Sequence, residues 1–290
     1  MSESIPARPA DTTPLASFEA KWAAVHPEFG LALKFVAEHE RGAQSAFASL
    51  VYELEHAAFG IREAQPAAMK LQWWGEEFAR CARHEARHPL TQALSDHPGF
   101  AQIPLAQWYA VIGGALAQRD PEPAAEGQDL LDQYAQFHAP LGAIDAQLFG
   151  GDATTIVGAL SLARALRETA ALLDTLRDGK LPLPLDLLAR HRLARGDLAE
   201  ASAARNQALS EWFRRLAGEM LGLLKLWTAV PGLKAARLGT LRSAMVAADS
   251  TRALHAARAS DPLMAINSAL PRLSISVVWA AWRAARRSRR

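Results

Sequence analysis

The sequence of 290 residues predicts an all-α protein. Alanine, leucine, arginine and glutamate dominate, β-branched residues are sparse, and apolar residues recur at helical spacing from Ser17 onward. Hydrophobic residues make up 50% of the chain, which is enough for a sizeable core. Neither a flexible linker nor a repeat of fixed period divides the sequence. We therefore expect a flexible segment over residues 1–16 and a single domain of roughly eight to ten helices over residues 17–290.

Two helices are expected in the first third of the chain. In the first, apolar residues recur at i, i+3, i+4, i+7 and i+11, while Glu53 and His56 project from the other side. The apolar stripe consists of Phe47, Leu50, Val51, Leu54 and Ala58. The second helix follows Pro66 and contains the adjacent residues Trp73 and Trp74. Adjacent side chains on a helix point in different directions, so at least one tryptophan is expected in the core.

Helix ends are marked clearly in the middle of the chain. A helix is expected from about Glu126 to Phe149, because Gly150 and Gly151 follow it and Asp152 can cap the next helix. The segment from Ala153 to Arg177 is expected to be one further helix, which the extended loop "DGKLPLP" ends. Further helix starts and stops are expected at Asp197, Pro231 and Asp261-Pro262.

Charge and cysteine content exclude several classes of protein. Lys+Arg 32 against Asp+Glu 30 gives a formal net charge of +2, so no overall field favours nucleic acid or anionic substrates. The single cysteine, Cys81, excludes an internal disulfide framework and a multi-cysteine zinc cluster. No signal-peptide core is recognisable near the start, and no apolar stretch is long enough to cross a bilayer. We therefore expect a cytoplasmic protein.

Residues 84–88 read "HEARH", the H-E-x-x-H pattern in which two histidines of one helix bind zinc. Pro89 follows directly and disfavours helical geometry at His88, so the pattern lies at a helix end. Neighbouring arginines also place positive charge where a zinc site would favour carboxylates. These are Arg80, Arg83 and Arg87. The pattern therefore predicts a charged helix end and no zinc site.

Four segments carry a resemblance to a known family. They are "AFASLVYELEH", "MKLQWWGEEF" with "HPLTQAL", "LLDQYAQFH", and "GALSLARALRE" leading into "GKLPLPLDLLARHRL". In this order and spacing they resemble the squalene/phytoene synthase family of head-to-head prenyl transferases, over roughly Ala43 to Asp197. The resemblance implies an isoprenoid-synthase-like helical bundle around a central cavity. Active members join two prenyl diphosphates and hold Mg²⁺ against them with two facing aspartate-rich motifs.

Both aspartate-rich motifs depart from the family pattern. The first motif falls on Glu55, His56 and Phe59. The second falls on Arg167-Glu168, Ala171 and Leu172. Only Glu55 and Glu168 are acidic, whereas a magnesium cluster needs several anionic oxygens. Asp174 and Asp178 form an i,i+4 pair nearby, but on a continuous helix their carboxylates would turn away from Glu168.

The segments "LQWW" and "PLDLL" are nearer to the non-catalytic branch of the family, which includes the mitochondrial complex I assembly factor that resembles phytoene synthase. The resemblance thus implies a pseudoenzyme without a metal cofactor. Such a protein would bind a prenyl or other lipid ligand, or assist the assembly of a membrane complex with a protein partner. The alternative is an active prenyl transferase of isoprenoid biosynthesis that condenses prenyl diphosphates, with Mg²⁺ held by Glu55, Glu168 and Asp174.

Eight residues are candidates for the ligand pocket: Glu53, Glu55, His56, Gln72, Tyr134, Arg164, Arg167 and Glu168. Arg164 and Arg167 could hold a diphosphate between them, since guanidinium groups suit phosphate oxygens, or they could form ion pairs with Glu168 or a neighbouring helix. Tyr134 could line the cavity or serve as packing. The glutamates and His56 could equally be solvated residues of a helix surface.

The C-terminal segment "SVVWAAWRAARRSRR" combines two tryptophans with five arginines at and beyond Arg283. Such a helix can rest on an anionic membrane surface as a peripheral contact. The alternative is a last core helix with a soluble basic tip. No aromatic residue is interleaved with the arginines in a way that suggests base stacking, so nucleic acid is not an expected partner.

Overall fold

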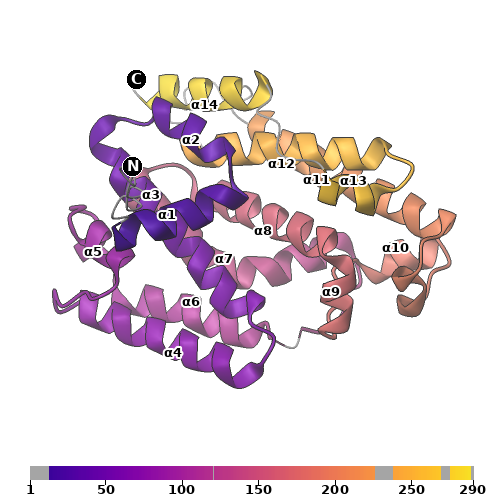
Figure 1. Cartoon of the computed structure of the whole chain (residues 1–290), viewed down its shortest axis with the longest axis horizontal. Helices are drawn as coiled ribbons and strands as arrows, with labels where there is room; N and C mark the ends of the chain where they lie inside the picture. Colours follow the sequence, from indigo (N-terminus) through magenta and orange to yellow (C-terminus); the bar gives the residue numbers. More distant parts are fainter. Residues whose placement is uncertain (1–12, 120, 226–237, 269–274, 289–290) are drawn as a thin grey trace, which may run out of the picture.

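The computed structural model describes residues 13–119, 121–225, 238–268 and 275–288. These residues form fourteen α-helices and no β-strand, which confirms the all-α class (Figure 1). Helices outnumber the roughly eight to ten expected, because several short connections are themselves helical. The short helices are α2 (Glu28–Ala32), α5 (Pro89–Ser95), α9 (Leu172–Arg177), α10 (Leu185–Arg190) and α13 (Pro262–Ser268).

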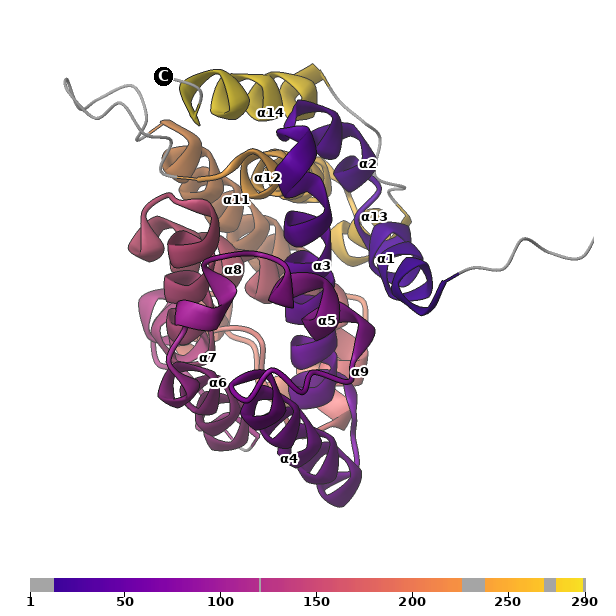
Figure 2. The ribbon, with the colours of Figure 1, turned by 90° about the vertical axis from the view of Figure 1, so that its left-hand side faces the viewer.

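The long helices form a series of packed neighbours. They are α1 (Pro14–Val25), α3 (Glu38–Glu55), α4 (Ala64–Cys81), α6 (Leu105–Ala117), α7 (Gly127–Phe149), α8 (Ala153–Ala170), α11 (Ala203–Lys225), α12 (Thr240–Arg258) and α14 (Ile275–Ser288). α7 and α8 lie side by side in the middle, with α6 and then α4 beyond α7. On the other side α8 is followed by α11, α12 and α14 (Figures 1 and 2).

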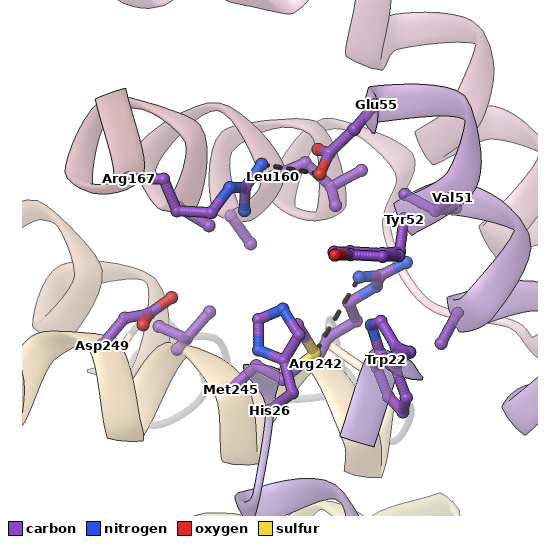
Figure 3. Close-up of a pocket in the computed structure, with 14 residues that line it drawn as sticks. Trp22, His26, Val51, Tyr52, Glu55, Leu160, Arg167, Arg242, Met245 and Asp249 are labelled. Atoms are coloured by element: carbon purple, nitrogen blue, oxygen red, sulfur yellow. Dashed lines mark hydrogen bonds and ion pairs between the residues drawn. The ribbon is translucent and has the colours of Figure 1, made fainter. Parts of the chain in front are cut away.

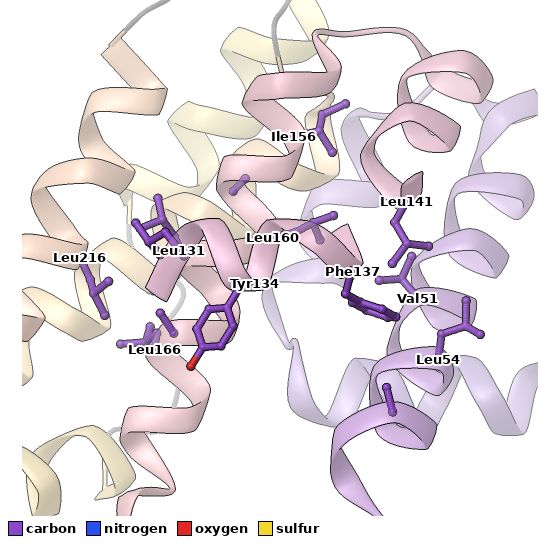
Figure 4. Packing of buried hydrophobic residues seen from close by; sticks show 14 of the residues in the cluster. Val51, Leu54, Leu131, Tyr134, Phe137, Leu141, Ile156, Leu160, Leu166 and Leu216 are labelled. Carbon is purple, nitrogen blue, oxygen red and sulfur yellow. The ribbon is translucent and has the colours of Figure 1, made fainter. Parts of the chain in front are cut away.

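The main core lies where α3, α7, α8 and α11 meet. All five residues of the predicted apolar stripe are buried there. In Figure 4, Val51 and Leu54 of α3 face Phe137 and Leu141 of α7. Of the two adjacent tryptophans, Trp74 is 1% exposed whereas Trp73 is 39% exposed, in agreement with the expectation that at least one would pack in the core.

Local capping explains the ends of α7. The Glu126 backbone N–H donates to Asp129 at 2.9 Å, forming a capping box, and Gly150 ends the helix with a φ of 76°. The Asp152 carboxylate then accepts a hydrogen bond from the Thr155 backbone N–H at 2.8 Å and starts α8. The predicted bounds of this helix and the predicted cap are confirmed.

The prediction of one continuous helix from Ala153 to Arg177 is wrong. α8 ends at Ala170, Ala171 leaves helical geometry with φ −89° and ψ 26°, and α9 begins at Leu172. The Thr175 hydroxyl donates to the backbone carbonyls of Glu168 and Ala171 at 3.1 and 3.0 Å. The Thr175 side chain thus satisfies the Glu168 carbonyl at the interruption, whereas the Ala171 carbonyl also keeps the Thr175 backbone N–H at 2.9 Å.

The ends of the other predicted segments are only partly described. α1 begins at Pro14, before the expected start at Ser17, because the Thr13 side chain accepts a hydrogen bond from the third residue after it. The remainder of the predicted flexible segment 1–16 lies outside the described residues, as does Pro231. α13 begins at Pro262, directly after Asp261, as expected. Asp197 lies within a short 3₁₀ turn.

α6 and α7 approach each other closely at Gly114. A Cβ atom on Gly114 would lie 2.8 Å from the Gln136 carbonyl oxygen and 3.0 Å from the Phe137 Cα. The neighbouring Gly113 has nothing within 4 Å of the corresponding position. Gly114 therefore allows the two helix backbones to pack at this distance.

Candidate functional site

A cavity of about 350 Å³, here called the outer cavity, opens between the end of α3, the end of α8, α9 and the loop that follows it. α3 continues into a π-helical turn (His56–Gly60) that supplies one wall. The charged lining residues are Glu55, Arg62, Arg164, Arg167, Glu168, Asp174, Asp178 and Lys180. Five of the eight predicted pocket residues line it: Glu55, His56, Arg164, Arg167 and Glu168.

Glu55 accepts hydrogen bonds at both carboxylate oxygens. Arg167 Nη2 donates to Oε2 at 2.6 Å, and His138 Nε2 lies 3.1 Å from Oε1. Burial by itself would raise the pKa of Glu55, but the positive charge of Arg167 and these hydrogen bonds hold that pKa well below its ordinary value. Burial lowers the pKa of His138 to about 4. The imidazole is therefore neutral at pH 7, with Nε2–H donating to Glu55 and Nδ1 3.2 Å from the Ser161 hydroxyl.

Glu168 is held in the same way by different partners. Arg164 Nε donates to Oε1 at 2.7 Å and the Tyr134 hydroxyl donates to Oε2 at 2.5 Å. Burial would raise the pKa of Glu168, but the charge of Arg164 and the bond from Tyr134 outweigh it and lower that pKa. The Arg164 guanidinium also lies over the Phe59 ring at 3.5 Å and donates to Gln118. Tyr134 thus positions Glu168 and is not itself part of the cavity lining.

The break at Ala171 brings two further acids to the outer cavity. Asp174 and Asp178 line it together with Glu168, so the expectation that they would turn away was wrong. That expectation assumed an unbroken helix. Arg62 binds both of them, at 3.3 Å to Asp174 and 3.1 Å to Asp178. Four cationic and four acidic side chains therefore face the cavity, and their formal charges balance.

A magnesium site here would need carboxylate oxygens that are free to bind the ion. All four carboxylate oxygens of Glu55 and Glu168 already accept hydrogen bonds from protein groups. Within the described ranges, no group of three or more His, Cys, Asp or Glu side chains is placed to hold a metal ion. A magnesium cluster needs several available anionic oxygens, so these residues, as arranged, do not fit one.

Lys180 is a pocket residue that sequence reasoning missed. Its ammonium group lines the outer cavity 5.8 Å from the centroid of the Phe59 ring. Within the part of the chain that the structure describes, the ammonium has no hydrogen-bond or ion-pair partner. Burial lowers the pKa of Lys180. Sequence reasoning also missed His138 as the buried partner of Glu55. His138 follows Tyr134 at i+4 within "LLDQYAQFH", and that spacing could have identified it.

A smaller inner chamber adjoins the outer cavity. Its space for water is about 20 Å³, enough for one molecule. Tyr52, Glu55 and Arg167 line both spaces, so the Glu55–Arg167 ion pair lies between them. Figure 3 shows this pair on one side of the chamber, with Trp22 and His26 among the residues of the other walls.

Glu53 and Gln72, two of the predicted pocket residues, lie elsewhere. Glu53 is buried, contrary to the expected outward position, because α1 and α4 cover it with Lys21 at 2.6 Å and Lys70 at 3.5 Å. Gln72 is exposed on α4, where it donates to Glu76. These two residues therefore contribute to the scaffold and the surface, not to the outer cavity.

The "HEARH" segment lies beyond the end of a helix. α4 ends at Cys81, and His84 has a positive φ of 62°. His88 caps α5 by accepting a hydrogen bond from the Leu90 backbone N–H at 3.2 Å. The two histidines therefore do not share a helix face, which the zinc motif requires.

The helical arrangement is an isoprenoid-synthase-like fold, because solved structures of that fold superpose on it. Two of the solved structures that share this fold are biosynthetic enzymes. A dehydrosqualene synthase in complex with ligand superposes with a TM-score of 0.60 and 12% identity, covering 84% of each chain. Squalene synthase HpnC from Alicyclobacillus acidocaldarius superposes with a TM-score of 0.60 and 16% identity, covering 87% of this chain and 94% of that chain.

The sequence matches the squalene/phytoene synthase family over residues 23–278. The chain therefore belongs to the squalene/phytoene synthase family, which confirms the prediction from its four segments. The match extends well beyond the Ala43 to Asp197 region in which those segments lie. No curated protein matches the chain.

Proposed function

We propose that this chain is a non-catalytic member of the family that binds a prenyl diphosphate or a similar lipid with an anionic head in the outer cavity. One observation carries the proposal. The two acids that remain at the aspartate-rich motifs are each bound by an arginine of α8: Glu55 by Arg167 at 2.6 Å and Glu168 by Arg164 at 2.7 Å. Guanidinium groups fixed in the chain thus occupy the carboxylates that would otherwise be available to Mg²⁺.

Cationic groups for the anionic head remain after these pairings. Arg167 uses one terminal nitrogen for Glu55, and Lys180 faces the outer cavity without a partner among the described residues. Both can donate to phosphate oxygens without a metal ion. The apolar side of a ligand could contact Phe59 and Ala171, which also line the cavity.

A binding measurement with farnesyl diphosphate tests the proposal. Titration calorimetry is expected to give the same affinity in EDTA and in Mg²⁺, with no diphosphate released. Lys180→Gln is expected to weaken binding about tenfold, because a charged hydrogen bond is lost. Lys34→Gln, which changes an exposed lysine outside the outer cavity, is the matched control. Binding that requires Mg²⁺, or equal binding by Lys180→Gln, contradicts the proposal.

The second candidate is an active Mg²⁺-dependent prenyl transferase. The observation in its favour is that Glu55, Glu168 and Asp174 line one cavity, so the break at Ala171 places three acids around a shared space. Metal binding would have to displace Arg167 and Arg164 from their carboxylates. Diphosphate release from geranylgeranyl diphosphate in Mg²⁺, abolished by Glu168→Gln, would establish this function in place of the first.

The resemblance to the non-catalytic branch supports a role in assembly of a membrane complex. We extend the proposal to a cytoplasmic protein that meets a protein partner at the membrane, as a peripheral contact. Among the described residues, no helix is long and apolar enough to span a bilayer. Expressing the Asp174→Asn variant in cells that lack the protein distinguishes a binding role from a catalytic one. The variant should restore assembly of the complex if the protein acts by binding. It should not restore assembly if Asp174 holds catalytic magnesium.

A further inference from the structure

α14 has one face packed on the protein and one apolar face left exposed. Its inner face consists of Val277, Ala281, Ala284 and Ala285, all buried. Val277 and Ala281 belong to a second core cluster with Trp22, Phe29 and residues of α12. The small side chains bring α14 close to α12 and fix it to the fold.

The outer face carries large apolar side chains at i, i+3, i+4 and i+7. They are Ile275, Val278, Trp279 and Trp282, with exposed fractions of 85%, 37%, 55% and 40%. Single exposed apolar residues are ordinary, but four on one helical stripe form a continuous patch that water solvates poorly. The patch therefore indicates a surface that is covered when the protein functions.

Arginines lie directly beside the two exposed indoles. The Arg283 guanidinium is 4.7 Å from the Trp279 ring centroid, and that of Arg286 is 5.3 Å from the Trp282 ring centroid. Trp282 and three arginines, Arg283, Arg286 and Arg287, also line a groove of about 230 Å³. The helix contains no acidic residue between Ile275 and Ser288. The stripe thus pairs apolar surface with positive charge only.

The position of α14 in the fold suits contact with a flat surface. Figures 1 and 2, which are related by rotation about the vertical axis, both place α14 at one edge of the molecule, opposite α4 and α6. Because α12 and α2 pack against its inner side, the outer stripe faces away from the other helices that the structure describes. An extended surface can therefore reach the stripe without first meeting the other helices.

We propose that the outer stripe of α14 docks on an anionic lipid bilayer, with Trp279 and Trp282 at the headgroup level and Arg283 and Arg286 on lipid phosphates. Indoles favour the interface between hydrocarbon and water, and arginines are attracted to an anionic leaflet. The inference rests on the proposed function at one point: a protein that binds a lipid ligand in its cavity has to take that ligand from a bilayer. Nucleic acid would explain the arginines but not Ile275 and Val278.

Cosedimentation of the full chain with vesicles tests the inference. Binding is expected for phosphatidylcholine mixed with phosphatidylglycerol, weaker at high salt and much weaker for phosphatidylcholine alone. Replacing both indoles, by Trp279→Ala and Trp282→Ala together, should weaken binding about tenfold or more. Arg286→Gln should weaken it about fivefold, the value for loss of one cation near an anionic surface.

Two variants at other exposed apolar residues serve as matched controls. Met264→Ala on α13 and Tyr109→Ala on α6 remove side chains that are 65% and 48% exposed, and both should bind vesicles like the original chain. Equal binding to neutral vesicles, full binding by the double tryptophan variant, or displacement of the vesicles by a duplex oligonucleotide overturns the inference. Thermal unfolding of each variant shows that the fold is retained.

The two proposals fail separately. The α14 variants should bind farnesyl diphosphate in solution like the original chain, because α14 is not part of the outer cavity. Vesicle binding without farnesyl diphosphate binding would contradict the proposed function and leave the docking surface in place. Farnesyl diphosphate binding without vesicle binding would contradict the docking surface and leave the proposed function in place.

Discussion

Arg164 and Arg167 differ in how far away along the sequence their partners lie. Arg164 binds Glu168, four residues on in the same helix, so its ion pair could be predicted from i,i+4 spacing. Arg167 binds Glu55, 112 residues away, and only the fold brings the two together. The sequence therefore identified residues of the outer cavity but could not predict this pairing.

Glu168→Gln is expected to destabilise the protein by about 3 kcal/mol, because it leaves the buried Arg164 guanidinium without its counter-charge. Arg164 is 2% exposed. The matched control is Glu219→Gln, which removes another i,i+4 pair, between Arg215 and Glu219, on the surface of α11. That change should cost less than about 1 kcal/mol. Urea unfolding measures both, and equal losses would show that burial of Arg164 does not matter.

His138 makes stability depend on pH. Its pKa is about 4 in the fold and 6.5 ordinarily, so the unfolded chain binds the extra proton between these values. The free energy of unfolding should therefore fall by about 2–3 kcal/mol as the pH decreases from 6.5 towards 4. In His138→Gln, which keeps a donor for Glu55 and cannot take up the proton, most of this fall should disappear.

Two details keep this measurement specific. The pKa of Glu55 is lowered from its ordinary 4.5, so stability due to Glu55 is present above that pH and lost only below it. Urea unfolding between pH 6.5 and 4.5 is therefore largely free of Glu55. Burial also lowers the pKa values of His56 and His88 and raises those of Asp145 and Asp249, but these groups are present in both chains, so the difference between the original chain and His138→Gln reports His138. His39→Gln, at a side chain that is 81% exposed, should retain the pH dependence of the original chain. An unchanged pH dependence in His138→Gln would contradict the assignment.

At the scale of elements, helix ends were predictable where the cause is local. The start of α8 depends on Asp152 and Thr155, three residues apart, and the end of α7 on a glycine. The break between α8 and α9 has no such marker, because Ala171 is itself a good helix former. It depends on the Thr175 hydroxyl and on Thr169, which the Trp212 indole N–H of α11 contacts at 3.1 Å.

Two adjacent glycines in α6 should respond in opposite ways to the same substitution. Gly114→Ala is expected to destabilise the protein by about 1–3 kcal/mol, because the new methyl group would press on the α7 backbone at Gln136 and Phe137. Gly113→Ala has open space and should stabilise it by about 0.5–1 kcal/mol through helix propensity. Thermal and urea unfolding would check both, and destabilisation of similar size in both variants would contradict the close approach of α6 and α7.

At the scale of the whole molecule, the class of fold was accessible from composition and from four ordered segments. The composition of the outer cavity was accessible only in part, because its walls join the end of α3 to the consecutive α8, α9 and following loop, more than 100 residues further along the chain. Asp178 and Lys180 reach it only through the bend at Ala171. Glu53 shows the converse: a helical pattern placed it outward, and the packing of α1 and α4 buried it.

Thermal unfolding of the intact protein should be insensitive to magnesium. Its melting temperature in excess Mg²⁺ and in EDTA is expected to agree within about 1 °C, because no ligand-linked stabilisation arises from a metal that does not bind. Farnesyl diphosphate at about 100 times its dissociation constant should raise the melting temperature by roughly 5 °C or more in both buffers. A rise with Mg²⁺ alone would favour the transferase alternative.

The position of Glu53 matters for anyone who shortens this chain for crystallisation. Lys21 of α1 lies 2.6 Å from its carboxylate, so a version starting after α1 would lose this ion pair and uncover the face of α3 on which α1 packs. Such a version should express poorly or aggregate, whatever the state of the ligand site. A trimmed protein that begins at Thr13 keeps Lys21 and the helix cap, and it is the shortest N-terminal boundary worth trying.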